Sequence, residues 1–126
     1  MGWPVEPDVL TELLLRVHRE YAPARVVITE NGAAFEDVVR DDGFVEDAER
    51  LRYLASHLEA AAAAIAEGVP LIGYFAWSLL DNFEWAMGYG TRFGIVHVDF
   101  ATQRRTLKAS GQWYRALLAN PPLPND

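Results

Sequence analysis

Two strand-like runs separated by a helical segment constrain the fold of this chain more than any other feature. The first run, Arg25–Thr29, is rich in β-branched residues and leads directly into Glu30, after which Asn31-Gly32 is a turn signal. The second run, Val69–Leu80, is almost continuously apolar, which is typical of a strand buried on both faces of a parallel sheet. Strands that alternate with helices predict a βαβ unit, and therefore an α/β fold with a parallel sheet.

Three segments have the residue spacing of helices. A helix is predicted from Pro7 to Tyr21, because leucines recur at helical spacing after a proline that suits a first turn. A second is predicted from about Glu46 to Glu67, where Gly68 provides a stop signal. The last helix contains residues 109–117 and ends before the prolines at 121 and 122.

The rest of the chain is predicted to be irregular. Residues 33–44 and 81–92 are expected to be loops, and Phe93–Phe100 is either a short strand or an extended return. Residues 121–126 are expected to be frayed. Because neither an internal repeat nor a domain boundary is visible, we expect a single unit over residues 1–126.

Composition excludes several classes of function. The net charge of −7 and a sequence pI of about 4.9 leave no basic stripe for nucleic acid, and they argue against an anionic membrane as a partner. The absence of cysteine excludes disulfides and thiolate chemistry. No secretory signal is visible and the longest apolar stretch is too short to cross a bilayer, so a cytoplasmic protein is the expectation.

Two places carry candidate chemistry, both at the ends of predicted strands. Glu30 follows the first strand, and the segment from Trp77 to Trp85 places two indoles around two carboxylates and an amide. Indole faces pack against sugar rings, and carboxylates accept hydrogen bonds from sugar hydroxyls. Composition alone favours a solvated turn residue at 30. In the second segment, spacing alone does not decide between a sugar site and core tryptophans with loop-capping acids.

Motifs along nearly the whole chain resemble glycoside hydrolase family 1. The segment 27–32, VITENG, is similar to the nucleophile motif of that family, and segment 73–85, GYFAWSLLDNFEW, is similar to its glycone-binding motif. Segments 92–100, 105–108 and 110–114 are similar to its C-terminal end, and Met1-Gly2-Trp3 resembles the loop after its sixth barrel strand. Taken together, and in this order, the motifs are highly specific.

The resemblance implies a role for each matching residue. Glu30 matches the catalytic nucleophile, Glu84 the carboxylate that holds the outer hydroxyls of the sugar, and Trp77 the platform at the edge of that subsite. Trp85 matches an indole that donates to a sugar hydroxyl, and Phe93 is expected nearby as a packing wall. We expect Glu30 on the floor of a pocket, near the indoles. The family retains anomeric configuration and needs neither a metal nor a cofactor.

The resemblance also implies that part of the enzyme is missing. Retaining glycosidases need a second carboxylate about 5–5.5 Å from the nucleophile, as acid and base. The family carries it in an Asn-Glu-Pro motif, which this sequence lacks. A (β/α)8 TIM barrel takes about 250 residues, so we expect this chain to be its C-terminal part, with the last two parallel strands and flanking helices. Met87 departs from the polar residue of many relatives.

Two kinds of function follow from this resemblance. The chain is expected to be part of a retaining β-glucosidase that acts on β-glucosides or short oligosaccharides. The alternative is a catalytically incomplete piece that only binds carbohydrate or assembles with itself. A two-stranded sheet leaves apolar surface bare, so the expected partner is the complementary N-terminal barrel portion or another copy of the chain.

The histidines and Asp99 are not expected to take part in the chemistry. His18, His57 and His97 lack metal-ligand spacing and are expected to be structural or without a role. Asp99 is expected to pair with one of the nearby arginines and so to shape its loop.

Overall fold

The computed structural model describes residues 2–120, so the predicted frayed tail at 121–126 lies outside the described residues. Helix α1 (Pro7–Tyr21) has the bounds that the sequence predicts. Its proline occupies the first turn, where a backbone N–H is not needed. The helix ends where Ala22 turns left-handed, with φ of 44°, and donates its N–H to the carbonyl of His18.

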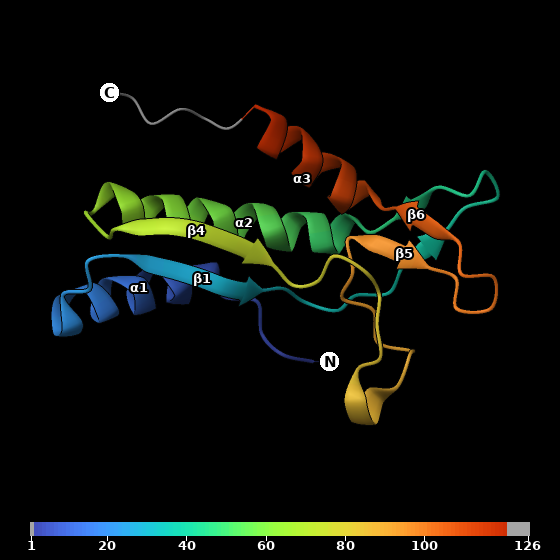
Figure 1. The fold of residues 1–126 in the computed structure, drawn as a ribbon, viewed down its shortest axis with the longest axis horizontal. Helices are drawn as coiled ribbons and strands as arrows, with labels where there is room; N and C mark the ends of the chain where they lie inside the picture. The colour runs from blue at the N-terminus through green and yellow to red at the C-terminus, as the bar shows by residue number, and fades with distance from the viewer. Residues whose placement is uncertain (1, 121–126) are drawn as a thin grey trace.

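A parallel pair of strands is the centre of the fold. Strand β1 (Val26–Asn31) lies beside β4 (Leu71–Ala76), and both run in the same direction (Figure 1). The helix α2 (Ala48–Ala66) connects them, so the predicted βαβ unit is confirmed.

The strand bounds differ from the prediction. Strand β1 continues through Glu30 and Asn31, because the Asn31 carbonyl still accepts the N–H of Trp77 at 2.9 Å. Strand β4 stops at Ala76 instead of Leu80, because the chain then changes partners. The N–H of Ser78 donates to the Phe93 carbonyl, and Leu80 forms a bridge with Val96.

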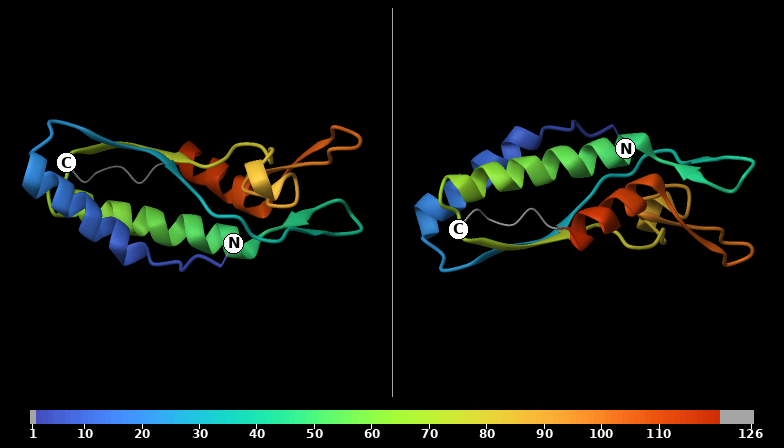
Figure 2. Two further views of the ribbon diagram at one scale, coloured as in Figure 1. Left: turned by 90° about the horizontal axis from the view of Figure 1, so that it is seen from below. Right: turned by 90° about the horizontal axis from the view of Figure 1, so that it is seen from above.

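Helices cover one face of the β1–β4 sheet. The buried cluster of Leu14, Ala64 and Val69 joins α1, α2 and the start of β4, and Val26 and Ile28 of β1 pack against it. Small alanines in α2 allow this close packing, which confirms the interpretation of the alanine run as a packed helix face. Figure 2 shows α1 and α2 together on one side of the strands.

The opposite face of this sheet is bare within the part of the chain that the structure describes (Figure 2). The side chains of Val27 and Phe75 stand on it, with exposed fractions of 41% and 60%. Apolar residues in the middle of a parallel sheet are normally covered on both faces. This face therefore has the apolar composition of a protein interior, although no described element covers it.

Two small hairpins were not predicted. Strands β2 (Val38–Val39) and β3 (Val45–Glu46) pair antiparallel within and just after the predicted loop. Strand β5 (Val96–Val98) falls in the segment expected to be a strand or return, but its antiparallel partner β6 (Arg105–Leu107) was missed. Strands of two or three residues are too short to show a hydrophobic period.

The remaining elements are η1 (Trp85–Met87), a single turn of 3-10 helix inside the predicted long loop, and α3 (Ala109–Ala119), which packs against α2. None of the described helices has the length and apolarity that crossing a membrane requires.

Candidate active site

Glu30 lies near the C-terminal end of β1, where the pairing with β4 is irregular. Between the pairs Ile28–Tyr74 and Asn31–Ala76, β1 advances by one residue more than β4 does. Thr29 and Glu30 therefore both lie opposite Phe75, as in a β-bulge. Both are exposed, like Phe75 itself. The irregularity thus falls at the position that the sequence assigns to the nucleophile.

The exposure of Glu30 differs from the expected pocket floor. The reason is the bare face, which no other described element covers. The next residue, Asn31, is nevertheless held in place. The Tyr74 hydroxyl donates to Asn31 Oδ1 at 2.7 Å on the helix side of the sheet. Burial raises the pKa of Tyr74, so this donor keeps its proton at any physiological pH. Asn31 is thus an anchor beside Glu30 as well as the start of a turn.

Trp77 comes from the neighbouring strand end. It follows β4 directly, and its side chain is 39% exposed. The loop after β1 passes so close that a Cβ at Gly32 would overlap the carbonyl oxygen of Trp77. Only glycine fits there without a shift of the backbone. The peptide bond from Trp77 to Ser78 is cis.

Glu84 and Trp85 lie at the start of η1, in the loop after β4. Glu84 is half-buried, and its N–H donates to the Gly88 carbonyl at 2.8 Å. The indole of Trp85 is 80% exposed. The ring of Tyr89 ties this loop to its surroundings, with centroids 5.3 Å from Phe83 and 4.5 Å from Phe100.

Phe93 is buried and lines a shallow hollow with Trp3 and Phe35. Because β1 and β4 are parallel, the loops that follow them leave the same edge of the sheet, where η1 lies in Figure 1. The structure thus places Glu30 and Trp77 at two adjacent strand ends, whereas Glu84, Trp85 and Phe93 lie farther along the loop after β4. Their roles in sugar binding and catalysis stay predictions.

Beneath these loops lies a buried network of charged side chains. Asp81 is its centre and is 4% exposed. Its Oδ2 accepts from Arg92 at 2.6 Å and from the N–H of Val98 at 3.2 Å, while its Oδ1 accepts from the N–H of Gly94 at 3.0 Å and from Lys108 Nζ at 2.8 Å. A buried carboxylate is stable only when paired in this way.

A second part of the network surrounds Arg50 of α2, which is 1% exposed. Its guanidinium donates to Asp47 at 2.6 Å and to Asp37 at 2.9 Å. It also donates to the carbonyls of Phe35 and Arg92, at 3.3 and 2.6 Å. Asp47 in turn accepts from the N–H and the hydroxyl of Ser110 in α3. The network therefore joins both loops to two helices.

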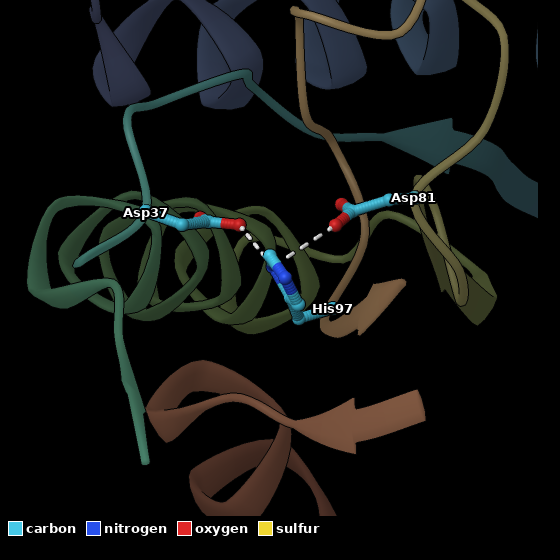
Figure 3. Close-up of side chains that lie close together, drawn as sticks. All are labelled: Asp37, Asp81 and His97. Carbon is cyan, nitrogen blue, oxygen red and sulfur yellow. Dashed lines mark hydrogen bonds and ion pairs between the residues drawn. The ribbon is translucent and has the colours of Figure 1, made fainter. Parts of the chain in front are cut away.

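One carboxylate oxygen of Asp37, one of Asp81 and a ring nitrogen of His97 all lie within 4.8 Å of one another (Figure 3). A metal ion could bridge atoms at this spacing. His97 Nδ1 lies 3.4 Å from Asp37 and 3.6 Å from Asp81. The ammonium of Lys108, however, already lies 2.6 Å from Asp37 and 2.8 Å from Asp81. A metal cation here would face this like charge, so we assign the cluster to an ion-pair network.

The network changes the acidity of Asp37. Burial alone would raise the pKa of its carboxyl group. The hydrogen bond from Lys108 and the charges of Arg50 and Lys108 outweigh burial, and the pKa lies below its ordinary value. Asp37 is therefore a carboxylate at neutral pH.

Sequence reasoning missed this network. Asp37, Arg50 and Lys108 received no role, and Asp81 was noted only as part of the sugar-binding motif. The one available signal was the position of Asp81 directly after an apolar run. The expected pairing of Asp99 with an arginine was wrong, because its carboxylate accepts from Ala101 and Thr102 in its own turn. Arg92 pairs with Asp81 instead.

Comparison with known proteins assigns the motifs to one family. The model of glycosyl hydrolase family 1 matches residues 1–121. The chain is 57% identical over 120 residues to beta-glucosidase A of Thermotoga maritima, a match that covers 95% of the chain and 27% of that relative. It is 49% identical over 124 residues to a bifunctional beta-D-glucosidase/beta-D-fucosidase of Bifidobacterium breve, with the same two shares.

Solved structures agree with this assignment. A beta-glucosidase from Thermotoga maritima in complex with glucoimidazole matches with a TM-score of 0.95 and 56% identity, over 98% of this chain and 28% of that one. A complex of the same enzyme with castanospermine matches over 99% of the chain, also with a TM-score of 0.95. The chain thus spans a little more than a quarter of the relatives it matches.

Proposed function

Because the chain belongs to glycosyl hydrolase family 1, a family of TIM-barrel enzymes, we propose that it forms part of a retaining β-glucosidase, with Glu30 as the nucleophile. The observation that carries this proposal is the bulge in β1. It leaves Glu30 exposed at the C-terminal end of β1, next to the end of β4 that Trp77 follows. Barrel enzymes place their reacting groups at that edge.

The proposed reaction follows the two-carboxylate scheme. The Glu30 carboxylate attacks the anomeric carbon, and the leaving oxygen takes a proton from a second carboxylic acid. A glycosyl-enzyme ester forms, and water activated by the second carboxylate then releases the sugar with its configuration retained. The sequence holds no Asn-Glu-Pro motif to supply this second group.

The proposed substrate is a β-glucoside or a short oligosaccharide. Relatives bear the names beta-glucosidase and 1,4-beta-D-glucan glucohydrolase, which supports a glucosyl group in the sugar site. Glu84 would accept hydrogen bonds from its hydroxyls, and Trp77 and Trp85 would contact the ring. Phe93 would pack behind them.

Alone, the chain is proposed to be inactive or nearly so. General acid–base groups contribute about 10²–10⁴-fold in rate, and this chain lacks the motif that carries one. Activity would require the complementary N-terminal barrel portion to cover the bare face of the sheet.

Recombination of the two portions tests the proposal. The chain is mixed with an N-terminal portion of a family 1 barrel, and release of nitrophenol from an aryl β-glucoside is measured. Recovered hydrolysis should disappear with Glu30→Gln and persist with Glu36→Gln, a matched change of an exposed acid in the following loop. Equal activity of both variants would contradict the role of Glu30.

A carbohydrate-binding piece without catalysis is the second candidate. The exposure of the Trp85 indole favours it, since an exposed ring can contact a sugar without a completed barrel. Calorimetry with glucose or cellobiose distinguishes the two functions. Binding by the chain alone that survives Glu30→Gln, together with no activity after recombination, would favour this candidate.

A further inference from the structure

Lys108 is a fully buried cation between two loops. It occupies the N-cap position of α3, and its exposed fraction is 0%. Its ammonium lies 2.6 Å from Asp37 Oδ2 and 2.8 Å from Asp81 Oδ1, so one charge neutralises two carboxylates at once. Burial of a charged group without such partners is costly.

The two carboxylates belong to different loops. Asp37 lies in the loop after β1, the strand that contains Glu30. Asp81 lies in the loop after β4, between Trp77 and η1. The Lys108 ammonium therefore bridges these two loops directly, at shorter distances than His97 Nδ1, which lies 3.4 Å from Asp37 and 3.6 Å from Asp81.

The base of the bridge is rigid. The Lys108 N–H donates to the Ile95 carbonyl at 3.0 Å, and its own carbonyl accepts the N–H of Gln112 in the first turn of α3. Each carboxylate is also fixed from its other side, Asp37 by Arg50 and Asp81 by Arg92. A movement of either loop would therefore stretch a bond to a fixed point.

We propose that Lys108 is a positioning residue that couples the loop after β1 to the sugar-binding loop after β4 through its ammonium. It thereby sets the distance between the nucleophile and the glycone-binding residues. Only the identification of Glu30 as the nucleophile and of the second loop as sugar-binding rests on the proposed function. The coupling itself is a property of the folded chain and can be measured without any enzymatic activity.

The coupling predicts a pattern among three substitutions. In Lys108→Met, backbone amides of both regions should exchange with solvent faster by roughly tenfold or more, because two buried carboxylates have lost their shared cation. Suitable amides are those of Arg40, in the β2–β3 hairpin that directly follows Asp37, and of Gly88, in the loop after β4. Asp37→Asn should loosen only the first loop, and Asp81→Asn only the second. Site-resolved hydrogen exchange measures all three.

A chemical rescue separates charge from packing. The chain has no cysteine, so Lys108→Cys introduces a single thiol. Alkylation of the unfolded variant with 2-bromoethylamine restores an ammonium at nearly the same length, whereas 1-bromopropane gives a neutral side chain of matched size. After refolding, only the aminoethylated form should recover the slow exchange of both loops.

The outcomes are distinct. Equal recovery with the propyl group would overturn the proposal, because the site would then need volume and not charge. Loosening of only one loop in Lys108→Met would also overturn it. If the Lys108 variants fail to refold, separate loosening by Asp37→Asn and Asp81→Asn supports the bridge, and identical loosening of both loops by either change contradicts it. None of these results depends on whether the recombined barrel hydrolyses a glucoside.

Discussion

A single carboxylate divides the proposed sugar-binding motif, segment 73–85, into two parts. Asp81 is buried and takes donors from Arg92, Gly94, Val98 and Lys108, whereas Trp77 is partly exposed at the sheet edge. One end of the motif thus meets the open face, and its middle holds the loop in place. Residues in one motif need not all touch the substrate.

Gly32→Ala should destabilise the chain and shift the strand end that carries Glu30. The added Cβ would overlap the Trp77 carbonyl oxygen, which is backbone and cannot rotate away. The expected cost is about 1–3 kcal/mol, as for other overpacked sites, measured by urea denaturation. Gly90→Ala is the matched control, because its Cβ would meet only an ordinary contact at 3.9 Å. Equal effects of both changes would contradict the close approach.

Asp37 should make the stability of the chain sensitive to acid. Its pKa is lower in the folded chain than the ordinary value of 3.8. A carboxylate with a lowered folded pKa contributes stability above its unfolded pKa, and this contribution is lost as pH falls through the folded pKa. Stability should therefore fall below about pH 4, and Asp37→Asn should remove part of that dependence.

The measurement compares the free energy of unfolding at pH 7 and pH 3. Wild type should lose more stability between these values than Asp37→Asn does. Glu59→Gln serves as the control, since it changes an exposed carboxyl group on α2. An Asp37→Asn variant with the full acid sensitivity of wild type would show that other groups are responsible.

Whether the role of a residue can be predicted from sequence depends on how far away its partners lie along the chain. Glu30 and Trp77 can be singled out because short motifs surround them, and their roles stay predictions. The bridge of Lys108 to Asp37 and Asp81 was missed, because these residues lie far apart in sequence and meet only after folding. A lone lysine before a helix is an ordinary sequence feature, and only burial reveals its role.

At the scale of elements, periodicity determined what could be predicted. Helix α1 was found with its correct bounds, because a full stripe of leucines repeats along it. The end of β4 was misplaced because Ser78 to Leu80 remain in extended pairing, but with the segment at 93–96 instead of β1. Apolar composition shows that a segment is paired or buried, without showing its partner.

Leu14→Ala should show how much the helix-covered face of the sheet contributes. Leu14 is 5% exposed and belongs to the cluster that joins α1 to α2 and β4, so its truncation should cost about 2–5 kcal/mol in the free energy of unfolding. Leu13→Ala is a close control, because the neighbouring leucine is 54% exposed in the same helix. Urea denaturation that gives similar costs for both would contradict this core.

At the scale of the whole molecule, two opposing surface properties determine association. The bare face of the sheet carries Val27 and Phe75, and exposed apolar patches promote contact between molecules. The net charge of −7 opposes that contact by repulsion. Repulsion between exposed charges is screened beyond about 10 Å at 0.1 M salt, whereas apolar burial is not weakened by such screening.

The isolated chain should therefore associate with itself through the bare face, and more strongly as salt increases. Phe75→Ser should lower the average mass measured by light scattering at 0.1 M salt, because it removes an apolar ring from the centre of that face. Val38→Thr is the control, since Val38 is 60% exposed on the separate β2–β3 hairpin and its replacement should leave association unchanged.

The N-terminal barrel portion should compete with self-association, because both would cover the same surface. A wild-type chain that stays monomeric at all salt concentrations, or a Val38→Thr effect equal to that of Phe75→Ser, would show that the bare face does not drive contact between copies.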